Sequence, residues 1–313
     1  MILSVGMRTD IVGFYLEWFL NRVNDGYVLV RNPYNRHHIS HYEINPEVVD
    51  LMMYCTKNPR PLVNHLKDNP NSVLWNYRSL YQITITPYEK DLELSVPKIT
   101  YVIQAVRELS RIVGKNKVVW RYDPICLTNK YTPEYHIEQF ERMASLLSDF
   151  VEVCIISFVD FYEKTKRNAP FLNDISKGEQ EKLVIKLNEI AKKYSMELRL
   201  CAEDLNHEKL NISKLGCLEL SDLERIYGIR LKDIKETFPR NQCRCLPARD
   251  IGAYNSCPHG CLYCYANEDK TRVIRNCKLH NPQSPLLLGE LEEEDVVYHS
   301  RQESYLDREL RLF

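Results

Sequence analysis

The stretch of sequence that decides the fold is residues 151–160, VEVCIISFVD. Its apolar run, Val151–Phe158, predicts a strand that ends in polar residues. A helical pattern precedes it, with Thr132 as the N-cap and Pro133 in the first helical position. Another helical pattern follows it, from about Glu179 to Tyr194. A strand between two helices predicts a βαβ unit and a parallel sheet.

The same alternation of short apolar runs and longer helical patterns extends along the chain in both directions. A further helix is predicted from about Pro97 to Gly114, where the glycine closes it. The segment before residue 45 departs from this rhythm and predicts a hairpin, Tyr27–Arg31 followed by His37–Glu43. The other predicted strands are Met1–Val5, Val49–Cys55, Tyr81–Thr86, Lys117–Arg121 and Glu197–Cys201. The predicted fold class is therefore α/β with a parallel sheet.

Each of these predicted sheet strands ends in a group of polar residues. In parallel α/β folds the carboxyl ends of the strands form one face, and ligands bind there. The charged residues that we take from these ends as candidate catalytic residues are Arg8, Asp10, Lys57, Arg121, Asp123, Asp160 and Glu203. The alternative is that Asp and Thr here simply cap the following helices, but capping gives no account of Lys57, Arg121 or Glu203.

Size and charge limit the class of protein. A length of 313 residues is typical of one barrel-like α/β domain. The net charge of −1 gives no reason to expect bulk attraction to nucleic acid or to an anionic membrane. No run reaches the roughly 18 to 20 apolar residues that span a bilayer, and the first residues lack a signal-peptide pattern. We therefore expect a cytoplasmic protein whose 11 cysteines are reduced thiols.

The segment CPHGCLYCY, residues 257–265, has the pattern C-x3-C-x2-C. Three thiolates this close in sequence can wrap one corner of an iron–sulfur cube, and Gly260 lets the loop turn with a positive φ. We therefore predict that Cys257, Cys261 and Cys264 hold a [4Fe-4S] cluster. Because the motif supplies only three ligands, one iron is left open to a molecule that binds through an amine and a carboxylate.

A zinc site is the main alternative for this loop. A structural zinc site usually pairs C-x2-C with a second such pair or with two histidines. His259 lies inside the loop and offers a fourth donor, which makes a Cys3His site. A third alternative, three unconnected core cysteines, fits their close spacing poorly.

The cysteine pattern, with the aromatic Tyr263 before its last cysteine, resembles the cluster loop of the radical S-adenosylmethionine superfamily. A wider resemblance, from residue 1 to about 290, is to the family called domain of unknown function 1848. It is carried by DIGAYNSCPHGCLYCYAN at 250–267, RTD at 8–10, TKNP at 56–59, RYDPI at 121–125, SFVD at 157–160 and CAE at 201–203. A second similarity, in Tyr81–Tyr88 and the RYDP run, is to the spore photoproduct lyase-like DNA repair enzymes.

These resemblances imply a parallel-strand barrel or partial barrel of the TIM type, with a [4Fe-4S] cluster and S-adenosylmethionine as the source of a 5′-deoxyadenosyl radical. They also imply a ferredoxin or flavodoxin as reductant, and a DNA lesion as substrate by analogy alone. The candidate ligands are then Glu203, Asp160 and Asp123 for the amine or ribose, Arg8, Lys57 and Arg121 for a carboxylate or phosphate, and Tyr263 and Tyr265 for the adenine. The alternative role of these residues is ion pairing within the barrel mouth.

The cluster loop normally follows the first barrel strand, whereas here it comes last. A closed barrel tolerates this order because its first and last strands are neighbours, so the loop still opens onto the face of Arg8 and Lys57. The chain lacks a Gly-Gly-Glu segment for the methionine amine, and Gly289-Glu290 is an isolated pair. This difference counts against S-adenosylmethionine binding.

Seven of the eight cysteines outside the loop fall into two sets, and Cys277 is assigned to neither. One set offers four thiols to a second cluster or to a zinc ion: Cys201, Cys217, Cys243 and Cys245. The alternative for Cys201 and Cys217 is that they are small hydrophobic core residues, as buried cysteines usually are. The other set lies within or just after apolar strands and is expected in the core: Cys55, Cys126 and Cys154.

We expect three regions along the chain: an α/β barrel-like core at 1–240, a cysteine-rich segment packed on its mouth at 241–285, and a charged tail at 286–313 that is a solvent-exposed helix or mobile. The radical enzyme has two rival functions. One is an iron–sulfur protein that only transfers or senses electrons. The other is a zinc-stabilised binding module.

Overall fold

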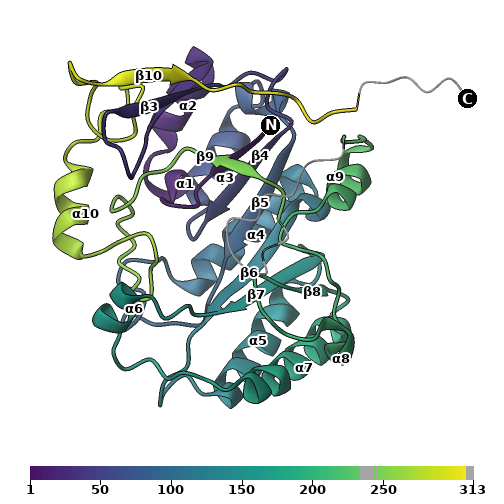
Figure 1. Cartoon of the computed structure of the whole chain (residues 1–313). Coiled ribbons are helices and arrows are strands. Elements are labelled where there is room, and N and C mark those ends of the chain that lie inside the picture. Colours follow the sequence, from purple (N-terminus) through teal and green to yellow (C-terminus); the bar gives the residue numbers. More distant parts are fainter. Residues whose placement is uncertain (233–242, 244, 308–313) are drawn as a thin grey trace, which may run out of the picture.

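The structure, a computed structural model, describes residues 1–232, 243 and 245–307. Among these residues seven strands form one sheet in the order β8-β7-β6-β5-β4-β1-β9, and every neighbouring pair is parallel (Figure 1). The strands are β1 Ile2–Val5, β4 Leu51–Thr56, β5 Ser79–Thr84, β6 Val118–Ile125, β7 Val153–Phe158, β8 Glu197–Leu200 and β9 Ala248–Asp250. The predicted α/β class with a parallel sheet is confirmed.

Helices connect the strands, and the longest of them cover one face of the sheet (Figure 1). The helices are α1 Ile11–Phe14, α2 Leu16–Asp25, α3 Arg60–Asp68, α4 Ile99–Val113, α5 Pro133–Leu147, α6 Glu163–Asn168, α7 Lys177–Lys193, α8 His207–Leu210, α9 Leu220–Tyr227 and α10 Lys270–Cys277. Helix α5 starts as predicted, because the Thr132 hydroxyl accepts a hydrogen bond from the Tyr135 amide at 3.3 Å. In the part of the chain that the structure covers, no helix is long and apolar enough to cross a membrane.

The two faces of the sheet carry different side chains because successive residues of a strand point to opposite sides. The helical face packs into the largest apolar core, with Leu3, Tyr54 and Ile156 among its members. The opposite face is apolar near the start of the strands and polar nearer their carboxyl ends. Its apolar positions include Met53, Leu80, Val119 and Ile155, and the next positions on the same face are Cys55, Gln82, Arg121 and Ser157. Strand alternation therefore turns these later residues toward one cavity.

Closure of the sheet into a barrel would require pairing of its edge strands, β8 and β9. Within the described residues these two strands do not pair, so the structure shows an all-parallel sheet without showing closure into a barrel. Strand β9 pairs with β1, with Ile2 opposite Ala248 and Ser4 opposite Asp250. In chain order, β1 and β9 are the first and last strands of this sheet, and their pairing places the chain that leaves β9 beside the chain that leaves β1. The sequence analysis did not predict β9.

A small second sheet contains the predicted hairpin. Its strands β2 Tyr27–Arg31 and β3 His38–Glu43 are antiparallel, and β10 Val296–His299 pairs in parallel with β3. The prediction of a helix or a mobile tail after residue 290 is therefore wrong at residues 296–299, which form β10. The sequence pattern missed it because the strand is held by tertiary contacts: Asp295 accepts two hydrogen bonds from the Arg31 guanidinium, at 2.6 and 2.7 Å.

Candidate functional site

A cavity of about 1680 Å³ lies at the carboxyl ends of the strands. It brings together side chains that are far apart in the sequence. The predicted residues that line it are Arg8, Lys57, Arg121, Asp123, Asp160, Tyr263, Tyr265, the loop cysteines Cys257, Cys261 and Cys264, and the second set Cys201, Cys217, Cys243 and Cys245. Asp10 and Glu203 are not among the lining residues. The predicted convergence of strand ends on one site therefore holds for most of these residues.

The cysteine loop, residues 257–264, is fixed against the segment that follows β5. The Leu262 amide donates to the Leu92 carbonyl at 3.0 Å, and the Ser95 amide donates to the His259 carbonyl at 2.8 Å. Gly260 turns the chain with φ +69°, as predicted. These backbone contacts hold the loop in one conformation at the edge of the cavity.

The position of Gly260 gives a test of this conformation. A side chain at residue 260 would adopt an unfavourable positive φ, and its Cβ would lie 3.3 Å from the Leu94 Cβ. We expect Gly260→Ala to destabilise the protein by about 1–2 kcal/mol in urea unfolding. Gly178→Ala is the matched control, since residue 178 lies in α7 with nothing within 4 Å. A Gly260→Ala protein as stable as the control variant would contradict the turn described here.

The donor groups of the loop fit an iron–sulfur cluster. Cys257, Cys261 and Cys264 all line the cavity and are partly buried. Burial raises the pKa of the Cys257 thiol to about 12, and it also raises the pKa of the Cys261 thiol. Both thiols therefore favour the protonated form, and a metal that binds them has to displace the proton. The thiols offer soft sulfur ligands from one short loop, which is the donor set of such a cluster.

Asp10 and His259 form a buried pair directly behind the loop. The His259 ring donates from Nε2 to Asp10 Oδ2 at 2.7 Å, and the Lys57 amide donates to the same oxygen at 2.9 Å. The other carboxylate oxygen accepts from the Gly13 amide at 2.8 Å and so caps α1. His259 is 2% exposed, and its Nδ1 has no hydrogen-bond partner among the described residues. Asp10 therefore orients His259, and with the proton on Nε2 the Nδ1 atom can accept a hydrogen bond or bind a metal.

The Asp10–His259 pair predicts a pH dependence of stability. Burial disfavours the ionised form of Asp10, but hydrogen bonds from His259, Thr56 and Lys57 outweigh it and hold its pKa below the ordinary 3.8. We expect Asp10→Asn to cost about 1–3 kcal/mol at pH 7, because an amide has only one accepting oxygen.

Since the pKa of Asp10 is lowered in the folded protein, its contribution is complete above pH 3.8 and is lost as the pH falls through the folded value. The stability difference between wild type and Asp10→Asn should therefore shrink in urea unfolding below pH 4. Asp149→Asn, at an exposed position, should show no such change. A difference that stays constant down to pH 3 would show that Asp10 does not act as a carboxylate here.

Comparison with protein families gives one match. The model of the family described as domain of unknown function (DUF1848) matches residues 2–266, which include the sheet and the cysteine loop. The chain belongs to the DUF1848 family. Comparisons with curated proteins and with solved structures found no match.

In this DUF1848 chain, Lys57 is paired with Glu93, a residue that the sequence analysis did not single out. Glu93 is 3% exposed, and its Oε1 accepts from Lys57 Nζ at 2.7 Å and from the Thr86 hydroxyl at 2.6 Å. Burial lowers the pKa of Lys57, but the charge and hydrogen bond of Glu93, together with Cys261 and Asp123, outweigh it, so the net shift of the pKa is upward. The Tyr263 hydroxyl also donates to Glu93. Tyr263, predicted to contact adenine, therefore also anchors the loop.

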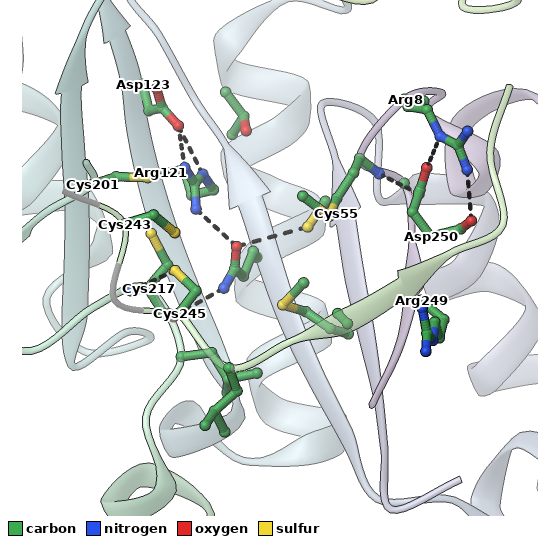
Figure 2. Close-up of a pocket in the computed structure, with 18 of the residues that line it drawn as sticks. Arg8, Cys55, Arg121, Asp123, Cys201, Cys217, Cys243, Cys245, Arg249 and Asp250 are labelled. Carbon is green, nitrogen blue, oxygen red and sulfur yellow. Dashed lines mark hydrogen bonds and ion pairs between the residues drawn. The ribbon is translucent and has the colours of Figure 1, made fainter. Parts of the chain in front are cut away.

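The two predicted arginines of the DUF1848 cavity are also paired with carboxylates (Figure 2). Arg8 forms an ion pair with Asp250 and donates to its carbonyl at 2.7 Å. Arg121 donates from Nε to Asp123 Oδ2 at 2.9 Å and from Nη1 to Gln82 Oε1 at 2.9 Å. Both arginines therefore form the ion pairs that the sequence analysis gave as their alternative role. Both also line the cavity.

Three other predicted residues have well-defined places. Glu203 accepts from the Phe158 amide at 2.7 Å and lines a small cavity beside Cys201. Asp160 lines the main cavity and accepts from the Tyr162 hydroxyl at 3.3 Å. Tyr265 donates to the Met7 carbonyl, so it ties the cysteine loop to the end of β1.

The core cysteines follow the prediction in part. Cys126 and Cys154 are fully buried in apolar clusters, as expected. Cys55 was expected in the core, but it lines the cavity. The prediction was wrong because Cys55 lies on the same strand face as Met53, one step closer to the carboxyl end, where that face opens to the cavity.

Proposed function

We propose that this chain is an iron–sulfur enzyme that binds S-adenosylmethionine and cleaves it reductively. The observation that carries the proposal is that Cys257, Cys261 and Cys264 come from one loop and line one cavity at the carboxyl ends of a parallel sheet. The cavity, at about 1680 Å³, exceeds the roughly 300–1,000 Å³ of common ligand pockets. This volume accommodates a cluster together with a nucleoside ligand and a substrate.

The spacing of the loop thiols favours a cluster over zinc. A tetrahedral zinc ion with Zn–S of about 2.3 Å brings its sulfurs within about 3.8 Å of one another. Among the described residues, His37, Glu292 and Asp295 form a group of three possible metal ligands whose donor atoms all lie within 4.8 Å of one another. The three loop thiols do not form such a group. At least one pair of the loop sulfurs is therefore more than 4.8 Å apart, which is wider than the sulfurs of a zinc site.

The bound cluster supplies one-electron reduction of the sulfonium, and a ferredoxin or flavodoxin is the expected source of that electron. The residues of the chain supply binding and orientation. Arg8, Lys57 and Arg121 place positive charge on the cavity wall, where carboxylates or phosphates bind. In this proposal the sheet is a partial barrel with its open side between β8 and β9, and the substrate enters the same cavity.

The test is anaerobic. The protein is purified, reconstituted with iron and sulfide, and incubated with dithionite and S-adenosylmethionine, and 5′-deoxyadenosine is quantified by chromatography. We expect a brown protein and formation of 5′-deoxyadenosine. Brown protein without this product would overturn the proposal in favour of electron transfer or sensing. A colourless protein with stoichiometric zinc would favour the binding module.

A further inference from the structure

Four cysteines outside the loop line the same cavity. Cys201 follows β8, Cys217 precedes α9, and Cys243 and Cys245 precede β9. Figure 2 shows their sulfur atoms gathered on the side of the pocket where Arg121 lies. We call these four residues the cysteine quartet. None of them belongs to the loop at 257–264, so a site built from the quartet is independent of the proposed function.

The sulfur atoms of the quartet lie close together on the cavity wall (Figure 2). The Cys217 amide also donates to the Cys245 sulfur at 3.3 Å. Three segments that are distant in sequence thus deliver their sulfur atoms to one place.

The surroundings of the quartet are those of an anionic centre. Arg121 donates from Nη2 to the Cys201 sulfur at 3.5 Å, and its guanidinium lies between the quartet and Asp123 (Figure 2). Cys201, Cys217 and Cys243 are between 5% and 7% exposed, and all four residues line the main cavity. Cysteines that serve only as apolar core would not need a buried cation beside their sulfur atoms.

We propose that Cys201, Cys217, Cys243 and Cys245 hold a second iron–sulfur cluster, a [4Fe-4S] centre with four thiolate ligands. Its anionic charge would be balanced by Arg121, and N–H groups that donate to its sulfurs would stabilise it. Four thiolates can also hold a zinc ion, whose tetrahedral site places its sulfurs about 3.8 Å apart. Metal analysis of the full chain separates these two occupants.

The experiment counts iron and acid-labile sulfide after anaerobic reconstitution of the full chain. Three proteins are compared: the wild type, a loop variant with Cys257, Cys261 and Cys264 changed to alanine, and a quartet variant with Cys217→Ser and Cys245→Ser. We expect about eight irons per chain in the wild type and about four in each variant. Cys154→Ala, in the core on the helical face, is the control and should keep the wild-type count.

The loop variant leaves the quartet unchanged, so its iron content tests the second cluster even if the quartet variant does not fold. A loop variant that binds no iron would overturn the second cluster. So would a wild type that binds about four irons, if the quartet variant retains them. Zinc bound to the quartet, or a disulfide between two of its cysteines in the anaerobic protein, would overturn it as well. If the loop itself holds no cluster, the loop variant keeps the full iron content while the quartet variant loses it, which separates the two proposals.

Discussion

Replacing Cys257, Cys261 and Cys264 by alanine is expected to abolish formation of 5′-deoxyadenosine completely and to remove about four irons per chain. The loss is expected to be total because, in the proposed function, these three thiols hold the centre on which the reaction depends. The visible absorption of the reconstituted protein should fall in proportion to the iron that is lost. Product and iron are measured on the same anaerobic preparation.

A matched control separates loss of the cluster from loss of the fold. Cys154→Ala also removes a buried thiol, but from the apolar core on the helical face of the sheet. It should cost some stability and leave both product and iron unchanged. If the loop variant retains the wild-type iron content, or still forms the product, these three cysteines do not hold the catalytic centre.

Replacing Glu93 by glutamine is expected to destabilise the protein by about 3–5 kcal/mol in urea unfolding at pH 7. The change leaves the Lys57 ammonium buried without its counter-charge, and it weakens the hydrogen bond from Tyr263 that anchors the loop. Glu89→Gln is the matched control. Glu89 pairs with Lys130, but its side chain is 70% exposed, so we expect a change within about 1 kcal/mol.

A second substitution distinguishes the ion pair from simple packing. In the double variant Glu93→Gln with Lys57→Met, no unpaired charge remains, so part of the lost stability should return. If the two single changes are instead additive, Lys57 and Glu93 are not energetically coupled. Reconstitution of Glu93→Gln would also show whether the anchor matters to the loop, because a displaced loop should bind less iron.

The six sheet strands β1, β4, β5, β6, β7 and β8 and the helices α4, α5 and α7 could be predicted from the sequence because they depend on local patterns. The apolar run at Val151–Phe158, the Thr132–Pro133 helix start and the polar residues after each strand are all contained in short windows. The C-x3-C-x2-C spacing is local too, and it is sufficient to place Cys257, Cys261 and Cys264 on one loop. The convergence of strand ends on one cavity followed from the parallel order of the strands.

Only the tertiary structure revealed the partners of these residues. Glu93 lies in a segment without a regular pattern, and its partner Lys57 comes from another strand end. Asp250 meets Arg8 only because β9 pairs with β1, and β10 forms only because β3 offers an edge. The cysteine quartet comes from three segments that the fold brings together. Sequence periodicity reports the neighbours of a residue within one element, whereas charge pairs and metal ligands join different elements, and those contacts exist only once the chain has folded.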